Sequence, residues 1–180
     1  MNKGILSISQ VIALVDMTDY LSTFSTLNRI ILAKDHIDFT NGFMVARLNR
    51  DLSDILDFKT REQYQISSLD LRKWCELAEK NEDEWLDEES IRNLVYPAAP
   101  YPRLDKKFKD NARESFDTIA VNPVFMEVCQ VLDHPEIPLQ WRGAGTYEVD
   151  GCVVAAEYHA KSERGTYVVM GCRVDEGDIQ

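Results

Sequence analysis

The chain has 180 residues, of which 44% are hydrophobic, and it carries a formal net charge of −11 with a pI near 4.7. This length and composition are typical of one globular domain, or of one and a half small domains, and they exclude wholesale disorder. The apolar runs are too short to cross a bilayer and no signal-peptide pattern begins the chain, so we expect an unprocessed cytoplasmic protein. The acidic charge excludes indiscriminate binding of nucleic acid, although it leaves room for a local basic track.

Residues 1–60 predict a first half-domain built from a strand, a helix, a strand and a hairpin. The expected elements are a strand at 5–9, a helix over 10–22, a strand at 28–33, and a hairpin with strands at 36–40 and 43–47. The helix has one apolar stripe, formed by Val11, Leu14, Val15 and Leu21. Asn41-Gly42 predicts a type I′ turn in the hairpin, because that turn needs positive φ at both central residues.

Residues 61–100 predict a degenerate second unit with an acidic insertion. A strand at 63–66 leads into a helix whose start, with Ser67 and Asp70, resembles a capping box. Its predicted buried face consists of Leu71, Trp74, Cys75 and Ala78. The strands expected next are missing, and the acidic segment 76–89 stands in their place, followed by a short helix around 90–95. Three nearby prolines then predict an extended connector, which we place at 101–116.

Residues 117–174 predict a last half-domain, followed by an acidic tail at 175–180. A strand is expected at 117–121, and Asn122-Pro123 predicts a helix start because Asn caps helices and Pro is tolerated in their first turn. We expect this helix to stop at Asp133-His134-Pro135. The strands predicted after it lie at 138–142, 146–149, 152–158 and 165–174, with Gly143-Ala144-Gly145 as a hairpin loop. The whole pattern predicts an α+β fold of repeated strand–helix–antiparallel-sheet units.

The residues that carry chemistry in enzymes and metal proteins are dispersed. Neither the histidines nor the cysteines form closely spaced pairs, so we predict no metal and no cofactor, with Cys75, Cys129, Cys152 and Cys172 as buried reduced thiols. The sequence has no nucleophile elbow, phosphate loop or convincing carboxylate pair. Glu157 and His159 share one strand face, which we interpret as solvent-exposed. We therefore predict that the protein is not an enzyme.

Three stretches, in family order, resemble the bacterial DNA sliding clamp, the β subunit that holds the replicative polymerase on DNA. Thr26 to Leu32 with Gly42 to Leu52 is similar to the clamp's Leu-Asn-Gly strand and its Ala-Thr-Asp-Gly-His-Arg-Leu stretch. Tyr101 to Phe108 resembles the connector that begins Phe-Pro-Asp-Tyr-Arg-Arg. Ile119 to Asn122 with its helix, and Tyr167 to Val174, resemble the last clamp domain, which closes on Tyr-Val-Val-Met-Pro-Met-Arg-Leu. About half a domain is missing, as we expect of a short clamp-related protein from a prophage or mobile element.

The resemblance implies a DNA-clamp-like fold and a non-enzymatic role in DNA replication, as a processivity factor or regulator. In the clamp, replication proteins insert a linear peptide into an apolar groove between two domains. Carried over by position, the groove residues would be Leu27, Leu52, Pro102, Met170, Arg173 and Val174. The implied partners are a polymerase, a clamp loader or a host clamp. Arg47-Leu48-Asn49-Arg50 and Gly171-Cys172 depart from the clamp's residues, so we expect a changed peptide preference or a lost site.

The helices that would face DNA carry few basic residues. The candidate contacts to DNA or to an acidic partner are Arg72, Lys73, Arg103, Lys106, Lys107 and Lys109. The first and third helices offer Asp16, Asp19 and Glu127 instead, so we do not expect unaided sliding on DNA. One alternative is an acidic phage or mobile-element inhibitor that binds a host DNA-processing enzyme or the host clamp. Another alternative is a solitary domain with a vestigial groove. The sequence is also compatible with a homo-oligomer.

Overall fold

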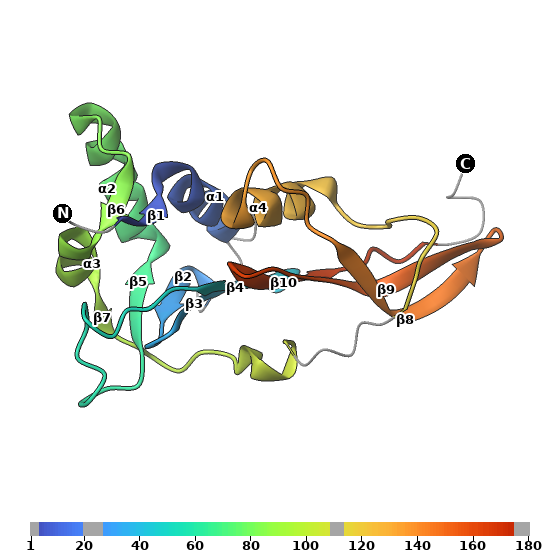
Figure 1. Ribbon diagram of the computed structural model, residues 1–180, viewed down its shortest axis with the longest axis horizontal. Helices are drawn as coiled ribbons and strands as arrows, with labels where there is room; N and C mark the ends of the chain where they lie inside the picture. The colour runs from blue at the N-terminus through green and yellow to red at the C-terminus, as the bar shows by residue number, and fades with distance from the viewer. Residues whose placement is uncertain (1–3, 20–26, 109–113, 175–180) are drawn as a thin grey trace. The chain divides into compact units, whose positions relative to one another are not determined.

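The computed structural model describes residues 4–19, 27–108 and 114–174 (Figure 1). Contacts divide the chain into two compact units, one formed by Met1–Gly42 with Arg47–Pro102 and the other by Phe43–Ala46 with Arg103–Gln180. Each unit combines helices with antiparallel strands, so the predicted α+β class is confirmed. Within the described ranges, no helix is both long and apolar enough to span a membrane.

The first unit contains two strand–helix–strand motifs that exchange strands. The first motif is β1 (Gly4–Ser7), α1 (Ile8–Asp19) and β2 (Arg29–Leu32), and the second is β5 (Tyr64–Ser67), α2 (Ser68–Asn81) and β6 (Trp85–Asp87). β1 pairs antiparallel with β6, and β2 pairs antiparallel with β5. The first strand of each motif therefore lies against the last strand of the other, and α1 packs on α2.

The remaining elements of the first unit extend the sheet around β2. They are β3 (His36–Thr40), the part of β4 (Met44–Asn49) from Arg47 onward, α3 (Glu88–Leu94) and β7 (Tyr96–Pro97). The strand order in this unit is β7-β5-β2-β3-β4. Its fully buried core includes Leu6, Leu14, Ile30, Phe39, Leu71 and Leu86. Burial of these side chains is the main force that holds helices and strands together.

The helix α2 begins as its sequence predicts, but only three of the four residues predicted for its buried face are buried. Trp74 is half-buried, and its indole N–H donates to the Ser90 hydroxyl at 3.3 Å. The Ser67 hydroxyl oxygen accepts a hydrogen bond from the Asp70 N–H at 3.1 Å, and the hydroxyl donates to the Asp70 carboxylate at 2.6 Å. Its buried residues are Ser68, Leu71, Cys75 and Ala78, which recur at helical spacing. The helix ends at Glu82, whose left-handed backbone (φ 59°) lets its N–H reach the Ala78 carbonyl.

Two predictions for the first unit are wrong. The acidic segment does hold a strand, β6, in which Leu86 is fully buried while Trp85 is exposed. A three-residue alternation among carboxylates is too short to reveal a period of two in the sequence. The turn after β3 is not type I′ either, because Gly42 has a positive φ (92°) and Asn41 does not.

The second unit packs one α-helix beside three antiparallel strands of its own and the Met44–Ala46 part of β4, which neighbours β10. The strands are β8 (Trp141–Val149), β9 (Cys152–Lys161) and β10 (Gly165–Met170), with β9 in the middle. A short 3₁₀ helix, η2 (Leu104–Lys106), precedes them. The helix α4 (Pro123–Asp133) starts and stops as predicted, with the Asn122 side chain accepting from the Val124 N–H at 3.1 Å. It lies against β10 and buries Phe125, Val128, Cys129 and Leu132.

Three strand predictions for the second unit are wrong. Residues 117–121 form no strand, since Asp117 is tied by its N–H and by its carboxylate to the Val153 backbone. The two strands expected at 138–149 are one strand, and Gly143 lies inside it, where an added Cβ would come 2.9 Å from the Ala155 Cβ. β10 ends at Met170 instead of 174. The turn between the strands predicted to end at 149 and to begin at 152 is Asp150-Gly151, with φ of 52° and 78°.

Candidate peptide-binding pocket

An open pocket of about 490 Å³ lies in the second unit, where β10 ends. The residues that line it are Tyr147, Ala156, Met170, Gly171, Cys172, Arg173 and Val174. Three of the residues predicted for a peptide groove, Met170, Arg173 and Val174, therefore lie together around one cavity. Pockets of this size hold a few side chains or a small ligand.

The backbone after β10 is held in place by hydrogen bonds that form the back of the pocket. The Gly171 N–H donates to the Ala156 carbonyl at 2.7 Å, and the Cys172 N–H donates to the Ala120 carbonyl at 2.6 Å. A Cβ at position 171 would lie 2.4 Å from the Ala155 carbonyl oxygen. Glycine is therefore needed here for a close backbone approach.

Tyr147 on β8 forms a side wall that the sequence did not reveal. Its hydroxyl donates to the Cys172 carbonyl at 3.4 Å and accepts from the Val174 N–H at 3.4 Å. The ring thus fixes the segment 171–174 from the neighbouring edge of the sheet. Alternation could place Tyr147 in a strand, but no local signal shows that β8 faces the end of β10.

The pocket combines an apolar lining with polar groups at its rim. Met170 and Val174 are half-buried, and the flexible thioether of Met170 adapts to different apolar partners. Arg173 and Cys172 are exposed. This arrangement suits an apolar side chain entering between Met170 and Tyr147, with a carboxylate of the same ligand near the guanidinium.

The other predicted groove residues belong to the first unit. Leu27 is half-buried and lies near the turn at Gly42, where an added Cβ would be 3.9 Å from its Cδ1. Leu52 is fully buried, and its N–H donates to the Lys34 carbonyl at 2.8 Å. Leu27 and Leu52 thus lie beyond opposite ends of β2, whose four residues span roughly 13 Å. Pro102 is exposed at the end of this unit, and a groove shared by all six residues stays a prediction.

The residues Arg47, Leu48 and Arg50, at which the sequence departs from the expected clamp pattern, support the first unit internally. Arg47 donates two hydrogen bonds of 2.7 Å to the Asp38 carboxylate, and Leu48 is buried. Arg50 donates to the Ile5 carbonyl at 2.9 Å and to the Asn49 carbonyl at 2.7 Å. These side chains are therefore engaged within the fold.

The predicted basic contacts do not form a continuous track. Arg72 and Lys73 are exposed on α2, but Glu76 is exposed one turn later on the same helix. Arg103 and Lys106 are exposed in the second unit. The Lys107 ammonium donates to the Glu157 carboxylate at 2.5 Å, so its charge is partly neutralised. Lys109 lies outside the described residues.

Glu157 and His159 are less exposed than predicted. Both are half-buried, and the His159 Nε2 lies 3.1 Å from the Glu157 carboxylate. Burial alone would raise the pKa of Glu157, but the hydrogen bonds from Lys107 and His159 outweigh it and hold this pKa below its ordinary value. A carboxylate held ionised by two partners is typical of an ion-pair network that stabilises a sheet surface.

The cysteines differ in their exposure. Cys75 and Cys129 are buried as predicted, Cys152 is half-buried, and Cys172 is exposed, contrary to prediction. Burial raises the pKa of the Cys75 thiol to about 11 and raises that of Cys129 as well. Cys172 is exposed because β10 ends two residues before it, so no strand covers its side chain.

In the part of the chain that the structure describes, no three His, Cys, Asp or Glu side chains gather in a way that could hold a metal ion. No family model matches the chain, and no curated protein or solved structure shows significant similarity to it.

Proposed function

We propose that the protein is a non-enzymatic, sliding-clamp-like accessory or regulatory protein of DNA replication that binds a linear peptide of a partner. The observation that carries the proposal is the pocket of about 490 Å³ around Met170, Arg173 and Val174. The resemblance to the clamp implies these same three positions for a peptide groove. The pair of strand–helix–strand motifs in the first unit, with exchanged strands, further supports a repeat-based fold.

The binding mechanism follows from the lining of the pocket. A leucine or phenylalanine side chain of the peptide would enter beside Met170 and Tyr147 and leave water. Full burial of one such side chain contributes roughly 1.5–3 kcal/mol. Two or three anchors, offset by the cost of ordering the peptide, would give a dissociation constant of about 10–100 µM. The partner is a polymerase, a clamp loader or a host clamp that carries such a peptide.

A titration followed by fluorescence polarisation tests this proposal. A labelled peptide with the apolar anchors of clamp-binding motifs should bind saturably, and Met170→Ala should weaken binding about tenfold through lost apolar contact. Ile137→Ala is the matched control, because Ile137 is an exposed apolar residue of the same unit that does not line the pocket. Absence of saturation up to about 1 mM protein, or equal affinity of the Met170→Ala variant, would refute the proposal.

The acidic surface favours a second candidate function, an inhibitor that binds a host DNA-processing enzyme or the host clamp. The exposed carboxylates of the segment 76–89 are Glu76, Glu79, Glu82, Asp83, Glu84 and Glu89. A partner captured through these charges should be released as salt rises, because exposed charges are screened. Release that is insensitive to salt, together with loss of capture in the Met170→Ala variant, would favour the peptide pocket.

A further inference from the structure

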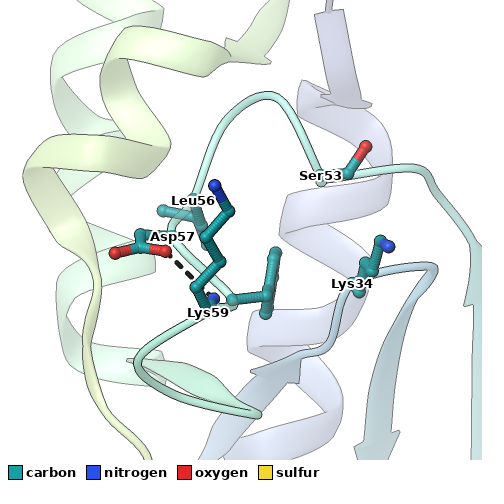
Figure 2. A pocket seen from close by; sticks show the side chains of 6 residues that line it. Lys34, Ser53, Leu56, Asp57 and Lys59 are labelled. Atoms are coloured by element: carbon teal, nitrogen blue, oxygen red, sulfur yellow. Dashed lines mark hydrogen bonds between the residues drawn. The ribbon is translucent and has the colours of Figure 1, made fainter.

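A second cavity, of about 460 Å³, lies in the first unit. The residues that line it are Lys34, Ser53, Leu56, Asp57, Phe58 and Lys59. Figure 2 shows Lys34 coming from the turn after β2, whereas the other labelled side chains come from the loop after β4. This cavity shares no residue with the peptide pocket and belongs to a different unit.

The loop that forms this cavity is held in one conformation by its own polar groups. Asp51 accepts hydrogen bonds from the Ser53 N–H at 3.0 Å and from the Ser53 hydroxyl at 2.6 Å. Asp57 accepts from the Lys59 N–H at 2.9 Å, as the dashed line in Figure 2 marks. Such side-chain-to-backbone bonds fix turns without help from a sheet.

Long-range contacts anchor the same loop to the rest of the unit. Arg92 on α3 donates to the Ile55 carbonyl at 3.1 Å, and the Tyr64 hydroxyl donates to the Asp57 carbonyl at 2.8 Å. The Phe58 ring packs edge-on against Tyr64, with their centroids 5.6 Å apart. The cavity is therefore largely preformed, which lowers the entropy lost when a ligand binds.

The charge of the cavity is unusual for this protein. The ammonium groups of Lys34 and Lys59 make no hydrogen bond or ion pair with any described residue, although the chain has 31 acidic residues. Asp57 is the one carboxylate among the lining residues, and it already accepts hydrogen bonds from Lys59 N–H and the Thr60 hydroxyl. Two exposed lysines against one aspartate give the lining a formal net charge of +1 in a chain of net charge −11, which favours an anionic ligand.

The apolar part of the lining narrows the ligand class. Leu56 is buried and Phe58 is half-buried, so an apolar surface lies beside the two lysines. A phosphate monoester carries close to two negative charges at neutral pH, which matches two ammonium groups better than a single carboxylate does. We propose that this cavity is a binding site for a small phosphomonoester whose phosphate is attached to an aromatic or other apolar group.

Calorimetric titration of the full chain tests the site with phenyl phosphate, inorganic phosphate and benzoate. Phenyl phosphate should bind about tenfold more tightly than either of the others, because only it offers both the dianion and the apolar group. Amide chemical shifts should move for Ser53, Phe58 and Lys59. Equal affinity for phenyl phosphate and inorganic phosphate, or shifts confined to other regions, would overturn the proposal.

The double variant Lys34→Met with Lys59→Met removes both charges and keeps the length of the side chains. It should bind phenyl phosphate about tenfold more weakly, with unchanged thermal unfolding. Lys73→Met with Lys80→Met is the matched control, because both of these lysines are exposed on α2 of the same unit. Equal weakening in the two double variants would indicate a general charge effect and would contradict a local site.

Discussion

At the scale of single residues, a partly buried polar cluster on β3 and β4, formed by His36, Asp38 and Arg47, constrains the first unit. Asp38 is almost fully buried, with 6% of its side chain exposed, and Arg47 neutralises it through two hydrogen bonds. Burial raises the pKa of Asp38, but the bonds from Arg47 and His36 outweigh it and hold the pKa below its ordinary value. A buried ion pair of this kind fixes which face of each strand turns inward.

His36 makes this cluster sensitive to pH. Burial alone would lower the pKa of His36, but its bonds to the Asp38 and Asp35 carboxylates raise it above 6.5. A group whose pKa is raised by folding stabilises the fold fully below its unfolded pKa, and this contribution is lost as pH rises through the folded pKa. His36→Gln should therefore lower the free energy of unfolding more at about pH 5.5 than at about pH 9.

Urea unfolding of the two proteins at both pH values measures this difference. The packing lost with the imidazole ring of His36 is the same at both pH values. The difference between the two losses of stability therefore reports the charge of His36 alone. An equal loss of stability at the two pH values would mean that the charge of His36 contributes nothing to the fold.

At the scale of elements, the sequence predicted those with strong local signals. The caps Ser67 and Asn122 mark the starts of α2 and α4, and apolar periodicity marks their buried faces. β6 was missed because its partner, β1, is about eighty residues away along the chain and only that pairing defines it. The sequence also predicts an extra loop at Gly143-Ala144-Gly145, inside β8, since a glycine-rich segment resembles a turn whether or not a strand runs through it.

The role of β6 gives a prediction at this scale. Leu86 is fully buried, so Leu86→Ala should lower the free energy of unfolding by about 3 kcal/mol through the cavity that it leaves. Leu77→Ala is the matched control, because Leu77 has the same side chain with 58% of its surface exposed on α2, and its loss should cost less than about 0.5 kcal/mol. Similar urea midpoints for the two variants would contradict the placement of β6 in the core.

In the candidate sites too, residues within one stretch of sequence are predictable, whereas residues brought together by contacts distant in the chain are not. Met170, Arg173 and Val174 were predicted because they are consecutive or nearly so in a stretch that resembles the clamp. Tyr147 was not, since it reaches the pocket only through the pairing of β8 and β9. Lys34 and Lys59 are 25 positions apart and meet at one cavity because the Leu52 N–H bonds to the Lys34 carbonyl. No pattern in one sequence reveals such a bond.

At the scale of the whole molecule, the chain has a net charge of −11 and a pocket in each of its two units, one around Met170 and one around Lys34. Acidic residues outnumber basic ones by 31 to 20, so counterion release from DNA would contribute little to binding. The proposed function requires that a peptide occupies the pocket around Met170. Cys172, which lines that pocket and is exposed, offers a direct way to test it.

The most direct test is the rate at which a maleimide modifies Cys172 with and without a saturating clamp-binding peptide. Cys75 and Cys129 are buried with raised thiol pKa values, so Cys152→Ser leaves Cys172 as the accessible thiol among the described residues. The peptide should slow modification of Cys172 by about tenfold, since a bound side chain covers the thiol, and Met170→Ala should remove the protection. Equal rates with and without peptide would contradict the account.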